Sequence, residues 1–389
     1  HPVRLPVPLS DADLDDALAG GDAAGRLVRA VKEARRGVPG HGIGYGVLRH
    51  LDPGAEPLGA APDVVFNYLG RFAAPDDGWR LPGDTPFAVL DPAAKALEQV
   101  LAINCFDGAD GLTVEWTAAG GVLDAATVAE LQACWAEALA ALAAHAERIG
   151  PDGGGLTPSD LPLVTLDQAD IDLLERDGPI ADVLPATALQ VGLAYQSQLL
   201  ADGEPDVYTV QAATYLDGPV DPDRMAAAAA ELLRRVPALR TRLGYTTSSD
   251  VVQVVPETVR PDVTFVDVSD RPDPAAAFAE IAAAEQARRF DPSTAPLIRF
   301  LLCRTGSDRY RLALTNHHSL LDGWSMPIAG RTLLAIYAEL GGGPAAPVPA
   351  PLDGYYRWRA DRDVPAARAA WAEELQGLEA PTLLAPTGS

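Results

Sequence analysis

Two adjacent histidines, His317 and His318, are the residues of this sequence best suited to acid–base chemistry. They follow residues 310–315, where β-branched and aromatic residues in partial alternation predict a half-buried strand. Asp322-Gly323 then marks a turn, and apolar residues recur at helical spacing over 326–340. Because successive side chains of a strand face opposite sides, the two imidazoles cannot point into one cavity. We expect one to pack or hold the loop and the other to face solvent or substrate.

Several kinds of chemistry could use a histidine pair beside an aspartate. Histidine and aspartate are metal ligands, but opposed faces and the lack of a clear third ligand nearby argue against a metal site, and we predict none. A serine triad is disfavoured because the chain has no G-x-S-x-G elbow. What remains is one imidazole acting as a general base or orienting donor, since its pKa lies near neutrality. The alternative is an ordinary strand end followed by a helix that Asp322 caps.

Composition limits the partners and the compartment. The chain has 389 residues, of which 48% are hydrophobic and 22% charged, as is typical of a globular protein with room for two domains. Its net charge of −24 is spread along the chain, which argues against nucleic acid or an anionic membrane as a partner.

The cysteines and the termini bear on the compartment too. Cys105, Cys134 and Cys303 are expected to be free thiols in a reducing compartment. No run of about 18 apolar residues occurs, so we expect a soluble, cytoplasmic protein. The start at His1 without a methionine suggests a piece of a larger polypeptide.

The first part of the chain mixes helical and strand patterns. Apolar spacing predicts one or two helices across residues 11–35 and a further helix around 128–142. A hairpin is predicted for residues 97–106 and 112–118, which flank a loop of aspartate and glycine. Residues 62–70 form an apolar strand with one polar member, Asn67. A buried asparagine needs either a hydrogen-bonding network or a ligand.

Periodicity disappears over residues 149–180, where glycine, proline and acidic residues predict a linker with one short helix at 167–175. Helical and strand patterns alternate afterwards, so we expect an α+β arrangement with one sheet flanked by helices. The strand at 297–304 is expected to pair with the histidine-bearing strand. The predicted division of the chain is therefore 1–148, a linker, and 181–389.

Residues 317–323 match the HHxxxDG motif of the condensation-domain superfamily of nonribosomal peptide synthetases. Four other segments resemble that family's elements in the same order: 184–193 its opening helix, 239–242 its LRTRF element, 352–358 its YxDYxxW element, and 371–382 the close of its first lobe. Five short motifs in one order make the resemblance specific.

The first part of the chain resembles another member of the same superfamily. Residues 36–46 fit the RxVPxxGxGYG motif of epimerization domains, and residues 62–70 fit their PxVxFNYLG motif. The resemblance implies the C-terminal lobe of an epimerization domain over 1–148 and the N-terminal lobe of a condensation domain over 181–389. In this superfamily a domain has two lobes similar to chloramphenicol acetyltransferase, each a mixed sheet flanked by helices, with the active site between them. Neither domain is expected to be complete here.

The resemblance implies roles for individual residues as well. His318 would be the catalytic residue of condensation, orienting or deprotonating an acceptor amine that attacks a thioester on the phosphopantetheine arm of an upstream carrier protein. His317 and Asp322 would support the loop, and Gly323 would let backbone approach the thioester. Asp322 usually pairs with an arginine in this family, and Arg299 on the preceding strand is the candidate.

Asn67 and Tyr68 match residues near the epimerization active site, where the α-proton of a carrier-bound thioester is removed and returned on the other face. Core packing and hydrogen bonding are their competing roles. An upstream epimerization domain implies a condensation domain that joins a D-configured donor to an L-configured acceptor. The implied partners are peptidyl carrier proteins on both sides and a neighbouring adenylation domain, with no cofactor beyond the carriers' phosphopantetheine arms.

Three alternatives stay open. The lobes could be a noncatalytic docking scaffold for carrier proteins, or a free-standing acyltransferase could act on a soluble acceptor. The two partial lobes could also associate in permuted order, within or between chains, and form a hybrid tunnel. Turnover by an extended protein, with and without carriers, distinguishes the first two from condensation.

Overall fold

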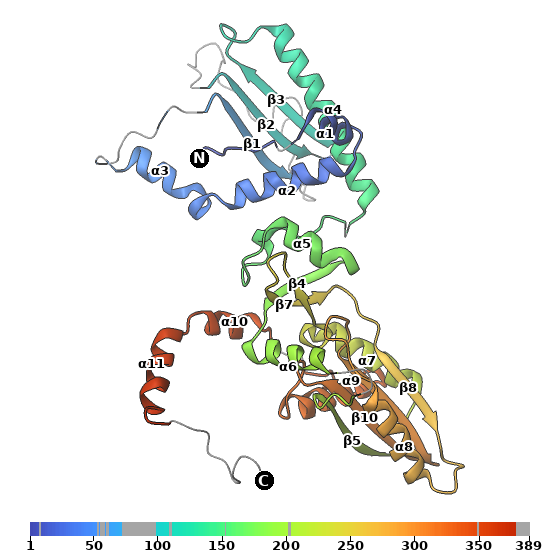
Figure 1. Ribbon diagram of the computed structural model, residues 1–389. Coiled ribbons are helices and arrows are strands. Elements are labelled where there is room, and N and C mark those ends of the chain that lie inside the picture. The colour runs from blue at the N-terminus through green and yellow to red at the C-terminus, as the bar shows by residue number, and fades with distance from the viewer. Residues whose placement is uncertain are drawn as a thin grey trace. The chain divides into compact units, whose positions relative to one another are not determined.

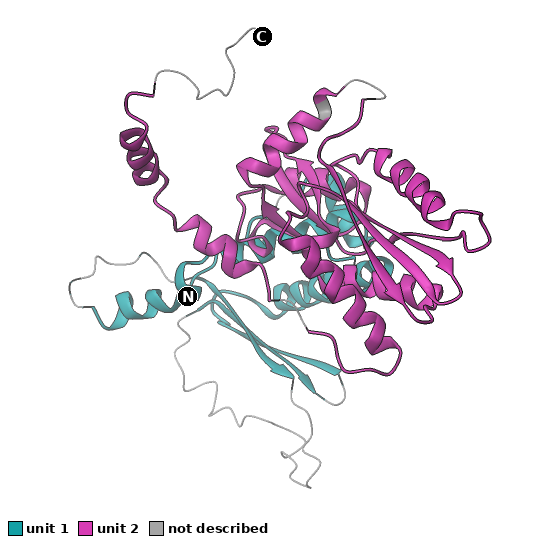
Figure 2. Cartoon of the chain, turned by 90° about the horizontal axis from the view of Figure 1, so that it is seen from below, with its two compact units in different colours: residues 1–155 teal, residues 156–389 magenta. Residues whose placement is uncertain are grey.

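The computed structural model describes residues 1–7, 9–52, 54, 59, 62–71, 99–108, 111–151, 153–200, 204–347 and 350–378. The chain divides into two compact units, His1–Gly155 (unit 1) and Leu156–Ser389 (unit 2) (Figure 2). Residues 97–98 of the predicted hairpin and 379–382 of the last family-like segment lie outside the described residues. No helix in the described ranges is long and apolar enough to cross a membrane.

The described part of unit 1 is a sheet with helices (Figure 1). Its strand order is β1-β2-β3, with β1 parallel to β2 and β2 antiparallel to β3. The predicted hairpin is therefore confirmed. The elements in chain order are α1 (Asp11–Leu18), α2 (Asp22–Arg36), the 3₁₀ helix η1 (Pro39–Gly42), α3 (Ile43–His50), β1 (Val64–Arg71), β2 (Leu101–Gly108), β3 (Gly111–Ala118) and α4 (Ala125–Ile149).

Local chemistry explains where the unit 1 helices begin. The Ser10 hydroxyl accepts from the Asp13 N–H at 3.3 Å, and the Asp124 carboxylate accepts from the Thr127 N–H at 2.7 Å, so α1 and α4 both have side-chain N-caps. A small core lies between β2, β3 and α4, where buried β2 side chains pack against Trp135. Most β1 side chains are exposed.

The described residues of unit 2 form two sheets, whereas the sequence predicted one. One sheet has the order β5-β10-β9-β8 and the other β4-β7-β6. The elements are η3 (Pro158–Asp160), α5 (Gln168–Leu174), η4 (Glu175–Asp177), β4 (Ile180–Pro185), α6 (Ala188–Leu199), β5 (Thr209–Asp217), α7 (Pro222–Arg235), η5 (Pro237–Arg240), β6 (Arg242–Tyr245), β7 (Val251–Pro256), β8 (Asp262–Asp267), α8 (Pro274–Ala287), β9 (Ile298–Gly306), β10 (Arg309–His317), α9 (Ser325–Leu340), α10 (Asp353–Ala360) and α11 (Val364–Glu374).

The four-stranded sheet carries the histidine pair at the end of β10. β10 is antiparallel to both β5 and β9, and β8 is parallel to β9. Helices α7 and α9 cover one face and α8 packs on the other (Figure 1). Alternate β9 residues follow this layering, since Phe300 packs in the α7 and α9 core while Leu301 packs in the α8 core. A strand buried on both faces has a continuous apolar sequence, as β9 has from Phe300 to Cys303.

Most of the predicted linker 149–180 folds into unit 2. Leu161, Ile171 and Leu174 are buried with Val183 of β4 and Val254 of β7 in one core beneath the three-stranded sheet. The boundary between the units falls instead at residues 155 and 156. The low periodicity has a simple cause, because α5 is only seven residues long and η3 and η4 are shorter still. The short helix expected at 167–175 is confirmed as α5.

The close packing of this core explains one glycine. A Cβ at Gly244 of β6 would lie 2.7 Å from the Leu174 Cδ2 and 2.7 Å from the Val254 Cγ2. A side chain at this position would have to push these two methyl groups aside, so glycine suits the close packing of β6 against α5 and β7.

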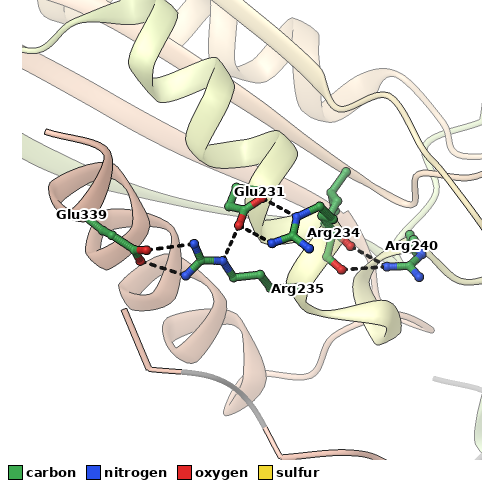
Figure 3. Close-up of polar contacts among 6 residues, drawn as sticks. Glu231, Arg234, Arg235, Arg240 and Glu339 are labelled. Atoms are coloured by element: carbon green, nitrogen blue, oxygen red, sulfur yellow. Dashed lines mark hydrogen bonds and ion pairs between the residues drawn. The ribbon is translucent and has the colours of Figure 1, made fainter. Parts of the chain in front are cut away.

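An ion-pair network joins α7 to α9, the helix that follows the histidines (Figure 3). The Arg235 guanidinium donates two hydrogen bonds to Glu339 of α9, at 2.8 and 3.0 Å, and one to Glu231 one turn back, at 2.5 Å. Arg240 donates to the Leu233 and Arg234 carbonyls at 3.0 Å each, so it caps the end of α7.

Both carboxylates of the network have depressed pKa values. The hydrogen bond from Arg234 is the largest cause of lowering the pKa of Glu231 to about 2, and the hydrogen bond from Arg235 lowers the pKa of Glu339 to about 2. A carboxyl group whose pKa falls on folding stabilises the folded state above its unfolded pKa of 4.5. That contribution is lost as the pH falls from 4.5 toward 2.

We therefore predict that Glu339→Gln reduces the acid sensitivity of folding. The wild-type Tm should fall between pH 5 and pH 3 by more than the Tm of the variant, because the glutamine has no carboxylate to protonate. Thermal unfolding followed by circular dichroism measures both slopes. Glu280→Gln, at an exposed position of α8, is the matched control and should keep the wild-type slope. Equal slopes for Glu339→Gln and wild type would contradict the prediction.

Candidate active site

The His loop, residues 317–324, connects β10 to α9 in unit 2. Backbone hydrogen bonds from both flanking strands hold its first two residues. The His317 N–H donates to the Leu297 carbonyl at 3.0 Å, next to β9, and the His318 N–H donates to the Tyr208 carbonyl at 2.8 Å, next to β5. The two amides therefore point to opposite neighbours, and strand alternation sends the two side chains to opposite sides.

The His317 side chain is buried, with an exposed fraction of 0%. Its Nδ1 accepts from the Ser319 N–H at 3.2 Å and lies 2.6 Å from the Ser319 hydroxyl oxygen. Because a backbone N–H can only donate, Nδ1 holds the lone pair and the proton of the neutral ring sits on Nε2. That Nε2–H points to Ser197 of α6, whose hydroxyl oxygen lies 2.9 Å away.

Burial keeps this imidazole neutral. Desolvation is the largest influence and lowers the pKa of His317 below its usual 6.5, and the neighbouring His318 lowers it further. Asp206 opposes this change, since its buried carboxylate Oδ2 lies 3.6 Å from the His317 Nε2. The pKa of His317 is lowered on balance, so at neutral pH its ring is uncharged and serves to form hydrogen bonds.

The His318 side chain is only half-buried, and its hydrogen bonding is the reverse of that of His317. Its Nδ1 lies 2.8 Å from the Leu321 carbonyl oxygen. A carbonyl oxygen can only accept, so the neutral form of His318 carries its proton on Nδ1 and keeps a lone pair on Nε2. An imidazole held in this tautomer by backbone is arranged to accept a proton or a hydrogen bond at Nε2.

Asp322 fixes the turn into α9 with the hydrogen bonds that the sequence predicted for a helix cap, because its carbonyl also accepts from the Met326 N–H at 3.1 Å, although the regular helix begins three residues later. The helix begins at Ser325 with Trp324 at the N-cap position. The Asp322 carboxylate accepts from the Trp324 N–H at 3.1 Å and from the Ser325 N–H at 2.7 Å. The Ser325 hydrogen bonds are the largest cause of a lowered pKa for Asp322. Gly323 is exposed, and a Cβ built there would meet nothing within 4 Å.

The expected pairing of Asp322 with Arg299 does not form. Arg299 is 5% exposed and makes a short ion pair with Glu285 of α8. It also donates to the Glu285 and Arg288 carbonyls at 3.0 and 2.6 Å. Its pKa is lowered, mainly by burial. Arg299 of β9 pairs with Thr315 of β10, which lies two residues before His317. Its side chain points to the face of the sheet that α8 covers, where it binds Glu285.

The epimerization candidates lie in unit 1. Asn67 and Tyr68 are on β1, and both are exposed. The Asn67 amide donates to the Asn104 side-chain oxygen at 3.3 Å across the parallel pair β1 and β2. The expectation of a buried asparagine is therefore wrong, because among the described residues β1 is an edge strand whose side chains are mostly exposed.

Two residues of the site were missed in the sequence. Ser197 and Asp206 contact His317 from α6 and from the turn before β5, more than 100 residues earlier in the chain. In the sequence these two residues stand out only as isolated polar residues between apolar elements. The described residues contain no group of three or more His, Cys, Asp or Glu side chains that could hold a metal ion.

Comparison with known proteins identifies the family. The model of the Condensation domain family matches residues 180–388, which is more than half of the chain and includes the His loop. The chain therefore belongs to the condensation-domain family. A starter condensation domain of rhizomide synthetase RzmA is among the similar solved structures, with 19% identity, a TM-score of 0.45, and coverage of 53% of this chain and 52% of that one.

Curated relatives align over nearly the whole chain. A linear gramicidin synthase of Brevibacillus parabrevis is 32% identical over 374 residues, which cover 93% of this chain. Chondramide synthase cmdD of Chondromyces crocatus is 29% identical over 446 residues, which cover all of it. The chain spans only 5% and 11% of the lengths of these two relatives.

The contrast between the two histidines predicts unequal effects on stability. His317→Ala should lower the free energy of unfolding by about 3 kcal/mol, because it leaves a cavity and unpaired groups on Ser197 and Ser319. His318→Ala removes one hydrogen bond from a half-buried ring and should cost about 1 kcal/mol. Urea unfolding of the three proteins measures the difference. Similar losses for both variants would contradict the assignment of His317 as the structural member of the pair.

Proposed function

We propose that unit 2 is the histidine-bearing N-terminal lobe of a condensation domain, similar to chloramphenicol acetyltransferase, that forms amide bonds in a nonribosomal peptide synthetase. One observation carries the proposal: the Leu321 carbonyl holds the His318 proton on Nδ1 and leaves the Nε2 lone pair at a half-buried position. Membership of the condensation-domain family supports it.

In the proposed reaction His318 is the catalytic residue. Its Nε2 accepts a hydrogen bond from the amine of a carrier-bound aminoacyl acceptor, and the amine nitrogen attacks the carbonyl carbon of the donor thioester. The C–N bond forms, the C–S bond breaks, and the proton lost by the amine ends on the departing sulfur of the phosphopantetheine arm. A neutral amine is already a nucleophile, so positioning supplies much of the rate, and proton transfer adds roughly 10²- to 10⁴-fold.

The other loop residues have supporting roles in this proposal. Asp322 fixes the first turn of α9 through the Trp324 and Ser325 amides. Open space around Gly323 suits a position that a thioester must approach closely. His317 stays neutral and buried, and it holds the strand end that presents His318.

We assign unit 1 in the same proposal to the C-terminal lobe of an epimerization domain. The support is its two epimerization-type motifs and an alignment with a synthase that covers 93% of this chain, so it includes most of the residues before 180. Exposed Asn67 and Tyr68 would then act near the thioester whose Cα is inverted. The condensation domain accordingly takes a D-configured donor, with peptidyl carrier proteins on both sides and an adenylation domain nearby.

The condensation proposal predicts that His318→Ala in the full synthetase lowers amide formation by roughly 10²-fold or more. The assay supplies a preloaded D-aminoacyl donor carrier and an aminoacyl acceptor carrier, and measures dipeptidyl product by mass spectrometry. His50→Ala, at an exposed position of α3, is the control and should keep the wild-type rate. An unchanged rate for His318→Ala would leave a noncatalytic scaffold, and turnover of a soluble acceptor without carriers would favour a free-standing acyltransferase.

The epimerization proposal predicts loss of the Cα proton to solvent. With the upstream carrier loaded with a Cα-deuterated amino acid, the full synthetase should wash out deuterium, and Tyr68→Phe or Asn67→Ala should slow the washout. Val122→Ala, at an exposed position in unit 1, is the control. Equal washout rates for wild type and both variants would remove Asn67 and Tyr68 from the site.

A further inference from the structure

We propose that Gln190 and Gln253 form a hydrogen-bond relay that positions the His loop, and that Gln190 is a positioning residue for His318. The catalytic part of this inference rests on the proposed condensation function. The structural part concerns the imidazole of His318 alone and can be tested without turnover.

Gln190 contacts the His loop directly. Its side-chain amide nitrogen donates to the Ser319 carbonyl at 3.0 Å and to the Gln253 side-chain oxygen at 2.8 Å. Its side-chain oxygen accepts from the Thr187 N–H at 2.9 Å, and its own N–H donates to the Thr187 hydroxyl at 3.1 Å. The contacts with Thr187 and Ser319 fix one orientation of the side-chain amide, because the Thr187 N–H can only donate and the Ser319 carbonyl can only accept.

Gln253 of β7 extends the relay to α10. It is 4% exposed, and its amide nitrogen donates to the Pro185 carbonyl at 2.9 Å and to the Tyr356 hydroxyl at 2.6 Å. Tyr356 is buried against Leu184 and Val255, so its hydroxyl is fixed in place. Both amide groups of the relay thus use their oxygen and both N–H bonds, so every polar atom of the two amides has a hydrogen-bond partner.

The relay acts on Ser319, the residue that follows His318. The Ser319 N–H and hydroxyl contact the His317 Nδ1 on one side, and its carbonyl is held by Gln190 on the other. His318 therefore lies between two clamped residues, and its own ring bonds to the Leu321 carbonyl two residues past Ser319. Releasing the Ser319 carbonyl would free the segment that sets the His318 tautomer.

A simpler role for Gln190 is local. Thr187 and Gln190 form the capping box at the start of α6, a common arrangement for threonine followed three residues later by glutamine or glutamate. Capping needs only the side-chain oxygen of residue 190, whereas the relay needs its amide nitrogen. Gln190→Glu separates the two roles, because glutamate keeps the cap and loses both donors.

The test compares His318 in the wild-type 389-residue chain and in Gln190→Glu at pH 8. Long-range ¹H–¹⁵N correlation spectra show which ring nitrogen carries the proton, and His318→Ala identifies the signal. Wild-type His318 should be protonated on Nδ1, and Gln190→Glu should shift it toward the Nε2–H form that free imidazoles prefer in water. In the full synthetase, kcat for condensation should fall roughly tenfold or more with little change in KM, since a misplaced base weakens the transition state and not carrier binding.

Two further variants keep the test decisive. Gln168→Glu removes a donor to the Leu156 carbonyl at the start of α5 by the same chemical change, and it should leave the His318 signal unaltered. Tyr356→Phe removes only the hydroxyl at the far end of the relay and should shift the His318 tautomer in the same direction by less, even if Gln190→Glu fails to fold. A wild-type tautomer in both relay variants would overturn the proposal. Normal turnover by His318→Ala would instead refute the condensation function and leave the relay intact.

Discussion

The hydrogen bonds of one buried imidazole organise the site. His317 closes the end of β10 by accepting from Ser319 of its own loop and by contacting Ser197 of α6, with no exposed surface of its own. A buried polar group is costly unless its partners are present, so the loop has little freedom to rearrange around this ring. The direction of the next residue, His318, depends on that constraint.

Neighbouring side chains of one type here have opposite chemistry because their backbone partners differ. The amide of Ser319 forces a lone pair onto the Nδ1 of His317, whereas the carbonyl of Leu321 forces a proton onto the Nδ1 of His318. One ring is thereby a structural donor toward α6, and the other has a free acceptor at Nε2. Strand alternation places the two rings on opposite sides of the strand, and the two backbone groups determine which ring nitrogen of each histidine carries the proton.

Helix α6 supports this arrangement from both of its ends. Gln190 in its first turn holds the Ser319 carbonyl, and Ser197 near its last turn meets the His317 ring. Near the C-terminal end of α9, the ion pairs among Arg235, Glu231 and Glu339 hold that helix against α7 (Figure 3). The His loop is therefore held directly by α6 and continues into a helix that is itself anchored to α7.

Much of the fold can be predicted from local patterns in the sequence. The α+β class, the hairpin of unit 1, the pairing of β9 with β10 and the placement of the histidines at a strand end all depend on periodicity and turn residues, which are local properties. The two-sheet division of unit 2 and the packing of 156–177 were not predicted, because β4, β6 and α5 are too short for a clear period.

The sequence by itself determined which residues could do chemistry, through the His-His pair, the Asp-Gly turn and the motifs around them. The tertiary structure alone decided their partners. In the folded chain Arg299 pairs with Glu285 and not with Asp322. Ser197 and Asp206 contact His317. Gln190 binds the Ser319 carbonyl, although the two residues are 129 positions apart in the sequence. Contacts between residues so far apart depend on how helices and strands pack, and no local pattern encodes that packing.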